Sequence, residues 1–207
     1  MTNESNITTA TGVLGELTLD HVILGEDFYT GILSVKRLSG AIDEVPVTIP
    51  GKLATPAETN VCITITGQLR SYNRVIDGTN RLIVTLFAQH IQPAQRGEDT
   101  QNRVTLTGTL CKQPIYRTTP FGREICDIML AVNRGFGKSD YIPCIVWGRN
   151  GLWTSRLNIG QRVSISGRFQ SRKYSKLLDS GEYEERTACE ISVFGIECAP
   201  PEMKVSV

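Results

Sequence analysis

The stretch SISGRFQS at residues 164–171 has a near copy one hundred positions earlier, TITGQLRS at residues 64–71. In both copies apolar residues alternate with small polar residues as far as a glycine, which is typical of a β-strand with one buried face. Elsewhere Arg37 corresponds to Arg134 at an offset of 97 (134 − 37). A period of this length is too long for a solenoid, so the chain contains two tandem copies of one β-rich domain.

The two copies differ in the lengths of their loops. Near the start of each copy, Gly15 aligns with Gly108 at an offset of 93 (108 − 15). The change from 93 to 97 predicts about four extra residues between the first two strands of the second copy. Homologous domains accumulate insertions in loops, so this difference is compatible with a shared fold.

Length and charge agree with two small domains. The 207 residues predict an N-terminal domain over residues 1–95, a polar linker over 96–102, a C-terminal domain over 103–198 and a short tail over 199–207. The first 99 residues hold 7 Lys and Arg against 11 Asp and Glu, and the remainder hold 15 against 10, so the net charges are −4 and +5. This asymmetry indicates a polyanion site in the second half, although an ordinary solvated surface explains it equally well.

Alternation and turn residues predict five strands in the C-terminal domain. They cover residues 103–110, 124–132, 141–147, 162–169 and 187–196, and a short helix over 150–157 separates the third strand from the fourth. This order is that of the OB-fold barrel. The predicted fold class is all-β with one short helix, arranged as two tandem OB-fold five-stranded barrels.

The N-terminal domain shows the same order in a weaker form. Its strands are predicted near residues 12–19, 27–35, 44–49, 61–69 and 81–89. Prolines bracket its helix segment at residues 50–56, so this helix is expected to be degraded.

Aromatic and basic side chains gather at the strand ends of the C-terminal domain. They are Arg134, Phe136, Tyr141, Trp147, Arg149, Arg172, Lys173 and Tyr174. Unstacked bases stack on aromatic faces at about 1 to 3 kcal/mol each while Arg and Lys follow the phosphates, and neither contact requires a particular base. Because base faces in a duplex are already stacked, this combination favours single strands.

Some of these side chains have a purely structural interpretation as well. Trp147 ends an apolar run, so it is either a core residue or a stacking platform. Trp153 lies in the predicted helix and is interpreted as a plug of the barrel. Arg117 and Arg123 flank the loop at residues 118–122. They either bind a nucleic-acid strand from both sides or are simply the solvated charges of a turn.

Residues 103–197 resemble the bacterial single-stranded DNA-binding protein family of replication and repair. The resemblance rests on TGTLCKQPIYRTTPFGREICDIMLAVNR, YIPCIVWGRN and ISGRFQSRKY, which occur in the right order and spacing. It implies base stacking by Phe136, Tyr141, Trp147 and Tyr174, and backbone contacts from Arg117, Arg134, Arg149, Arg172 and Lys173. The whole chain is similar to the tandem-OB variant of this family.

The N-terminal copy departs from the family pattern. At the positions of the four aromatic residues it has Ser39, Glu44, Pro50 and Arg74. Its remaining candidate contacts are Arg37, Arg70, Tyr72 and Arg74, so it is predicted to bind weakly. Family members work as assemblies of OB barrels, which implies that this copy takes the place of a partner subunit and that a homodimer presents four barrels. Drift after duplication, without a role, is the alternative.

The end of the chain also differs from replicative members of the family, which finish with an acidic recruitment peptide. Residues 199–207, APPEMKVSV, contain none. This difference favours an accessory, plasmid, phage or primosomal role.

The leading functional hypothesis is non-enzymatic, largely sequence-independent binding of single-stranded DNA in replication, recombination or repair. The alternative is a primosome-like or assembly adaptor that acts mainly through protein contacts, which the acidic, aromatic-poor first copy supports. Nuclease chemistry is disfavoured because the second copy has no histidine and its carboxylates are scattered. Stacking and phosphate contacts tolerate both sugars, so RNA remains an open ligand class.

Cysteine usage and hydropathy indicate the cofactors and the cellular location to expect. The cysteines form no CxxC pair and only His21 and His90 could join them as zinc ligands, so we expect reduced thiols, no metal and no cofactor. No apolar run is long enough to span a bilayer and the polar start lacks a secretory signal. The expected location is cytoplasmic, with the nucleoid.

Overall fold

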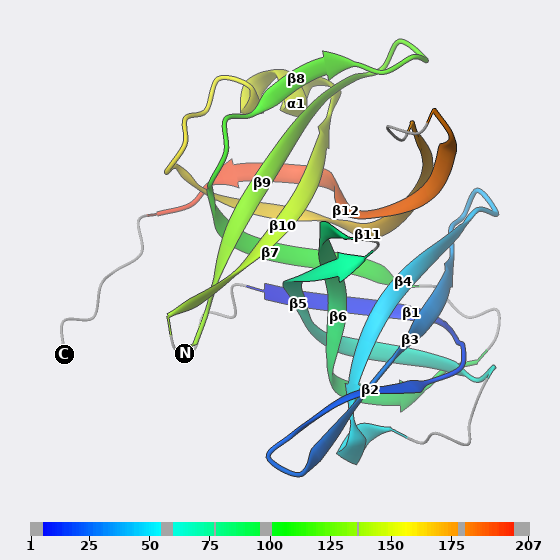
Figure 1. The fold of residues 1–207 in the computed structure, drawn as a ribbon. Coiled ribbons are helices and arrows are strands. Elements are labelled where there is room, and N and C mark those ends of the chain that lie inside the picture. Colours follow the sequence, from blue (N-terminus) through cyan, green and yellow to red (C-terminus); the bar gives the residue numbers. More distant parts are fainter. Residues whose placement is uncertain are drawn as a thin grey trace, which may run out of the picture. The chain divides into compact units, whose positions relative to one another are not determined.

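The computed structural model describes residues 6–54, 60–76, 78–95, 101–135, 137–177 and 181–200. Most of these residues lie in β-strands, and α1 (Gly148–Thr154) is the one α-helix among them (Figure 1). The chain divides into two compact units. One contains Val104–Arg168 and residues 191–200, and the other contains Ile7–Arg103 together with Phe169–Glu190. The prediction of an all-β fold with one short helix is confirmed.

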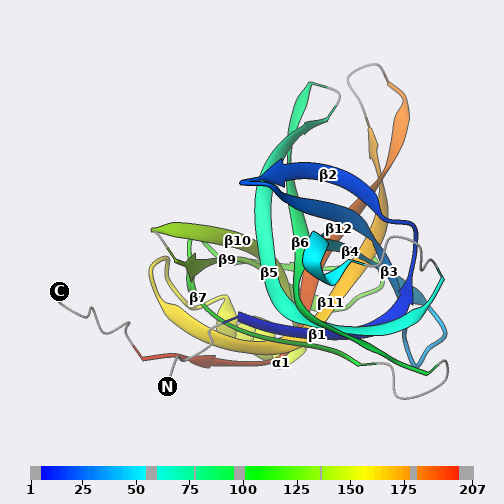
Figure 2. The same ribbon diagram turned by 90° about the horizontal axis from the view of Figure 1, so that it is seen from below.

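The N-terminal module is a closed set of six strands. They are β1 (Asn6–Leu14), β2 (Thr18–Ile23), β3 (Glu26–Lys36), β4 (Ile42–Pro50), β5 (Cys62–Ile76) and β6 (Thr79–Pro93), with a short 3-10 turn, η1 (Gly51–Leu53), after β4. Their order is β2-β3-β4-β6-β5-β1, and β1 also pairs with β3, which closes the barrel (Figure 2). Leu33, Ile49, Ile65 and Leu86 are completely buried inside it.

The C-terminal module repeats this plan. Its elements are β7 (Asn102–Leu110), β8 (Ile115–Thr118), β9 (Glu124–Arg134), β10 (Lys138–Trp147), α1, β11 (Arg162–Leu177) and β12 (Tyr183–Cys198). The order is β7-β11-β12-β10-β9-β8, and β7 closes the barrel by pairing with β9. Leu106, Leu130, Ile142 and Ile165 form part of its core. The helix lies between the third and fourth barrel strands, as the OB-fold requires.

A glycine marks the point where each barrel closes. A Cβ on Gly12 would lie 2.5 Å from the carbonyl oxygen of Ser34, and one on Gly108 would lie 2.9 Å from that of Ala131. Gly12 is thus the equivalent of Gly108, at an offset of 96 (108 − 12). The alignment of Gly15 with Gly108 is wrong, because the close backbone contact that demands glycine lies inside the strand and Gly15 follows it. The loop difference is one residue (97 − 96) instead of about four.

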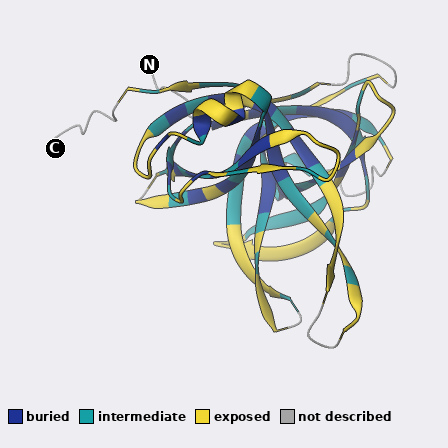
Figure 3. Cartoon of the chain, turned by 90° about the horizontal axis from the view of Figure 1, so that it is seen from above, coloured by how far each residue is buried: buried dark blue, intermediate teal, exposed yellow. Residues whose placement is uncertain are grey.

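The predicted strands are present, but their ends differ. β1 begins at Asn6 instead of residue 12, and β5, β6, β11 and β12 continue into long hairpins beyond the barrels (Figure 3). β2 and β8 were not predicted, because β2 is exposed along its whole length and β8 is short, so neither has an alternating burial pattern. The degraded helix of the first module is the 3-10 turn η1.

Three further observations apply to the described part of the chain. None of its helices has the length and apolar character needed to cross a membrane. No group of three or more side chains there could hold a metal ion. The six cysteines are free thiols.

Candidate nucleic-acid interface

Tyr141 and Trp147 lie on the same face of β10. Along this strand Ile142, Cys144 and Val146 are buried on the barrel side, so the alternate positions, which include Tyr141 and Trp147, lie on the outer face. Tyr141 is 48% exposed and Trp147 is half-buried. The strand therefore presents two aromatic rings on the outside of the barrel.

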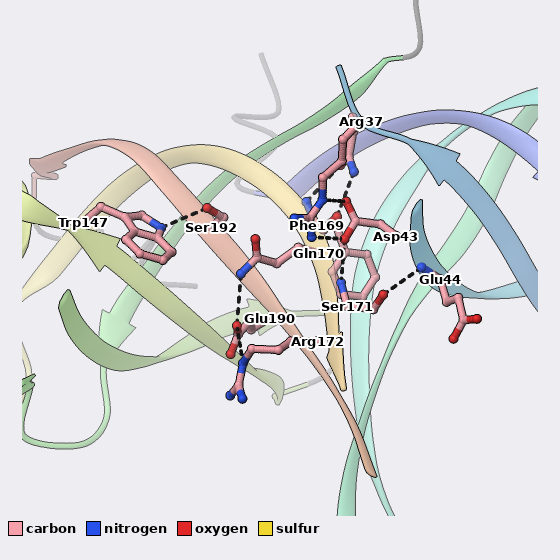
Figure 4. A network of polar contacts seen from close by, with 11 residues as sticks. Arg37, Asp43, Glu44, Trp147, Phe169, Gln170, Ser171, Arg172, Glu190 and Ser192 are labelled. Carbon is pink, nitrogen blue, oxygen red and sulfur yellow. Dashed lines mark hydrogen bonds and ion pairs between the residues drawn. The ribbon is translucent and has the colours of Figure 1, made fainter. Parts of the chain in front are cut away.

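The ring of Trp147 is held at one edge. Its Nε1 donates a hydrogen bond to Oγ of Ser192 on β12, at 3.0 Å (Figure 4). The two strands run parallel here, with Val146 opposite Val193. A ring that is anchored at its edge and still partly exposed can stack on a base while losing little rotamer freedom.

Arg149 follows the turn that leads from β10 into α1. Gly148 has a φ of 54°, a left-handed conformation that glycine adopts without strain. Asn150 Nδ2 donates to the carbonyl oxygen of Phe194 at 3.1 Å and holds the first turn of the helix. Arg149 is exposed, and within the described ranges no carboxylate pairs with it. It is therefore a cation two residues from Trp147 that a phosphate could use.

Arg134 and Arg117 are already paired with carboxylates. Arg134 Nε lies 3.6 Å from Oδ2 of Asp140, whose side chain is almost completely buried. Arg117 Nε donates to Oδ2 of Asp127 at 2.5 Å, across the pair β8–β9. The charges of both guanidinium groups are thus partly neutralised. Phe136, between β9 and β10 in the sequence, lies outside the described residues.

The β11–β12 hairpin carries Arg172, Lys173 and Tyr174, all exposed. The guanidinium of Arg172 lies 5.5 Å from the ring centroid of Tyr174, and its Nε lies 3.6 Å from Oε1 of Glu190. The same Glu190 oxygen accepts a hydrogen bond from Nε2 of Gln170 at 3.0 Å. Arg172 therefore supports one side of the Tyr174 ring, while Lys173 points to the other face of the strand.

The three candidate arginines of the N-terminal module, Arg37, Arg70 and Arg74, all contact other side chains. Arg37 donates through Nε to Asp43 at 2.7 Å, and this carboxylate raises the pKa of the arginine. Arg70 donates to Oε1 of Gln68 at 2.6 Å. Arg74 lies 3.7 Å from Asp20. The carboxylates beside Arg37 and Arg74 reduce the cationic charge available to a phosphate, and the Gln68 contact occupies one donor of Arg70.

A cavity of about 390 Å³ lies on the outer face of the N-terminal barrel. Its lining includes Thr30, Pro46, Tyr72, Arg74 and Thr85. By the internal repeat, Tyr72 and Arg74 occupy the positions of Arg172 and Tyr174 (offset 100). The cavity thus lies on the face of this module that corresponds to the aromatic face of the other module.

Comparison with known proteins agrees with this geometry. Residues 101–197 match the family described as the single-strand binding protein family. The matched segment covers nearly all of the C-terminal module.

Two curated single-stranded DNA-binding proteins are similar to the chain over 80 residues. The chain is 41% identical over 80 residues to single-stranded DNA-binding protein 1 of Staphylococcus aureus (strain COL), which is 35% of this chain and 48% of that protein. It is 38% identical over 80 residues to single-stranded DNA-binding protein A of Bacillus subtilis (strain 168), again 35% of this chain and 46% of that protein. The chain thus spans about half the length of the curated relatives it matches.

A solved structure extends the likeness to both modules. The wild-type single-stranded DNA binding protein from Thermus aquaticus matches with a TM-score of 0.70 and 21% identity, over 98% of this chain and 96% of that one. At this identity the match shows the fold alone, which is a tandem OB-fold arrangement.

One predicted role is wrong. Trp153 does not plug the barrel, because its side chain is 38% exposed. The helix turns Gly151 and Thr154 toward the core instead, and a Cβ on Gly151 would lie 2.7 Å from the carbonyl oxygen of Val146. The helix approaches the strand too closely for a large ring at the contact.

Sequence comparison between the copies also missed aromatic residues of the N-terminal module. His21 stacks on Phe28 with ring centroids 4.9 Å apart, and Phe28 is tilted against Phe87 at 6.2 Å. Arg70 lies 5.9 Å from the centroid of Phe87. These rings have no aromatic counterpart in the second copy, so an alignment that starts from the second copy passes over them.

Proposed function

We propose that this protein binds single-stranded DNA without enzymatic activity and largely without sequence preference, in replication, recombination or repair. The observation that carries the proposal is the outward aromatic face of β10, Tyr141 and Trp147, inside the segment that matches the single-strand binding protein family. Partly exposed rings beside cations suit unstacked bases and their phosphates.

The C-terminal domain, residues 103–198, supplies the main contacts in this proposal. Bases stack on Phe136, Tyr141, Trp147 and Tyr174, and phosphates are contacted by Arg117, Arg134, Arg149, Arg172 and Lys173. Arg149 and Lys173 contribute most to phosphate binding, because the other arginines already lie near carboxylates. The N-terminal domain, residues 1–95, contributes less, through Arg70, Tyr72 and Arg74. The bidentate contact of Arg37 with buried Asp43 favours a structural role for that residue.

The assembly is part of the proposal. A homodimer would present four OB barrels to one strand and act with the nucleoid in the cytoplasm. The measured molar mass in solution, with and without a dT oligomer, tests this point. A mass of two chains supports the dimer, and a mass of one chain at working concentration contradicts it.

Titration with a dT homopolymer tests the binding. Trp153→Phe leaves Trp147 as the fluorescent indole, and stacking on Trp147 is expected to quench its emission as the strand is added. A parallel gel-shift assay reports binding that does not involve this ring. Absence of both quench and shift at low salt would contradict the proposed function.

A further inference from the structure

The N-terminal module holds the strand that carries Arg172, Lys173 and Tyr174. Oδ1 of Asp43 accepts a hydrogen bond from the backbone N–H of Ser171 at 3.0 Å. In return, Oγ of Ser171 accepts a hydrogen bond from the backbone N–H of Glu44 at 2.7 Å (Figure 4). Both partners lie on β4, and the residue they hold immediately precedes Arg172.

The carboxylate in this contact is rigid. Asp43 is completely buried and is also bound by the guanidinium of Arg37. A buried carboxylate with a charged donor and a backbone donor has little freedom to move, because any shift would leave a donor unsatisfied in a region of low dielectric. Ser171 is therefore tied to a fixed point of the N-terminal barrel.

The other strand of the hairpin is tied to the same module. Arg81 on β6 donates through Nη2 to Oε1 of Glu184 on β12, at 2.8 Å. Arg186 donates to Oε2 of the same glutamate through two nitrogens, at 2.6 and 2.8 Å. The β5–β6 hairpin and the outer part of the β11–β12 hairpin, joined by this ion pair, extend together (Figures 2 and 3).

We infer that Asp43 and Glu184 are positioning residues for the single-strand site. They hold the two strands of the β11–β12 hairpin against β4 and β6, so that Arg172, Lys173 and Tyr174 are ordered before the nucleic acid arrives. Ordering a hairpin during binding costs conformational entropy, and a hairpin that is already held avoids this cost. This inference rests on the proposed function and gives the N-terminal module a role that does not depend on its own phosphate contacts.

The anchoring role and simple electrostatics predict opposite changes in DNA affinity when Glu184 is neutralised. Neutralising a carboxylate near a polyanion site should strengthen binding if charge alone matters. Loss of the anchor should weaken binding instead. Glu184→Gln keeps the shape of the side chain and removes the charge-assisted hydrogen bonds, so it separates the two effects.

The test measures affinity for a fluorescent dT oligomer with four variants: Glu184→Gln, Arg81→Gln, the double variant and Glu185→Gln. Glu185 is an exposed neighbour on β12, so its variant makes the same charge change without touching the anchor. We expect Glu184→Gln to bind roughly 3- to 10-fold more weakly. The double variant should be no weaker than Arg81→Gln, and Glu185→Gln should bind as the wild type or slightly more tightly. The salt dependence of Glu184→Gln should match that of the wild type, because no phosphate contact is lost.

Asp43→Asn gives an independent readout in the same protein. Amide hydrogen exchange at Ser171 and its neighbours should become faster, with dT affinity reduced. If Asp43→Asn fails to fold, the Glu184 series still decides the question. If the wild type binds dT and Glu184→Gln binds it as tightly as Glu185→Gln or more tightly, this inference alone is overturned. A wild type that does not bind dT would contradict the proposed function as well.

Discussion

The indole nitrogen of Trp147 lies 3.0 Å from the hydroxyl oxygen of Ser192, and this hydrogen bond joins the neighbouring parallel strands β10 and β12. It sets the plane of a ring that would otherwise rotate about its side-chain bonds. The equivalent position in the N-terminal module is Pro50, which has no ring of this kind and no donor. An anchored aromatic ring at this strand end is therefore a feature of the C-terminal module.

Trp147→Ala is expected to weaken binding to dT by about 1 to 3 kcal/mol, because a base loses its stacking surface. Ser192→Ala keeps the ring and removes only its anchor, so the loss should be smaller, at most about 1 kcal/mol. Fluorescence anisotropy of a labelled dT oligomer measures both, and Trp153→Phe is the control. Equal affinity of Trp147→Ala and wild type would exclude this ring from the site.

Salt dependence separates free cations from paired ones. Each phosphate contact contributes about −0.7 to the slope of log K against log salt on a single strand. Arg149→Ala and Lys173→Ala should each reduce the slope by about this amount, since both side chains are exposed. Arg74→Ala should leave it nearly unchanged, because Asp20 lies beside that guanidinium. A flat salt response of the wild type would contradict phosphate binding altogether.

The buried carboxylate of the N-terminal module predicts a stability effect. Asp43 and Asp140 are equivalent in the repeat, at an offset of 97 (140 − 43). Each is paired with an arginine six positions earlier. Arg37→Ala leaves the Asp43 carboxylate buried without its cation, which should lower the free energy of unfolding by roughly 3 kcal/mol. Urea denaturation measures it. Arg74→Ala breaks an exposed pair and should cost at most about 1 kcal/mol.

The Glu184 ion pairs predict a dependence on pH. Hydrogen bonds from Arg186 and then Arg81 hold the pKa of this carboxyl below its ordinary value of 4.5. A lowered folded-state pKa stabilises the protein above the unfolded pKa, and this contribution is lost as the pH falls through the folded pKa. The difference in Tm between wild type and Glu184→Gln should therefore be largest near neutral pH and shrink below about 4.5. A difference that grows in acid would show that the pairs do not stabilise the fold.

Cysteine reactivity tests the burial of two strands. Burial raises the pKa of the Cys126 thiol to about 11 and that of Cys189 to about 12, whereas Cys198 is exposed at the end of β12. At pH 8 alkylation should modify Cys198 first and leave Cys126 and Cys189 largely as thiols, because the thiolate is the nucleophile. Mass spectrometry of tryptic peptides follows each site. Early modification of Cys189 would show that the base of the hairpin opens readily.

Local patterns predicted much of the fold. Alternation identified the barrel strands, and Tyr141 could be placed beside Trp147 because residues of one strand face follow every second position. The same reasoning failed for Trp153, since a helix of this length has too few turns to show which side is buried. It also failed for β2, whose residues are all exposed and carry no alternation.

The sequence alone predicted the duplication, the two-barrel plan and the aromatic face of β10. Spacing and alternation are local properties, so they are visible in the order of the residues. The partners of the arginines could not be predicted in this way. Asp43, Asp127 and Asp140 neutralise Arg37, Arg117 and Arg134 through strand pairing, and Ser171 meets Asp43 across 128 residues of chain. The ion pairs are close in sequence, but strand pairing decides which carboxylate meets which arginine, and the Ser171 contact requires distant segments to fold together. Charge counted along the sequence therefore overstates the cations that remain for a phosphate.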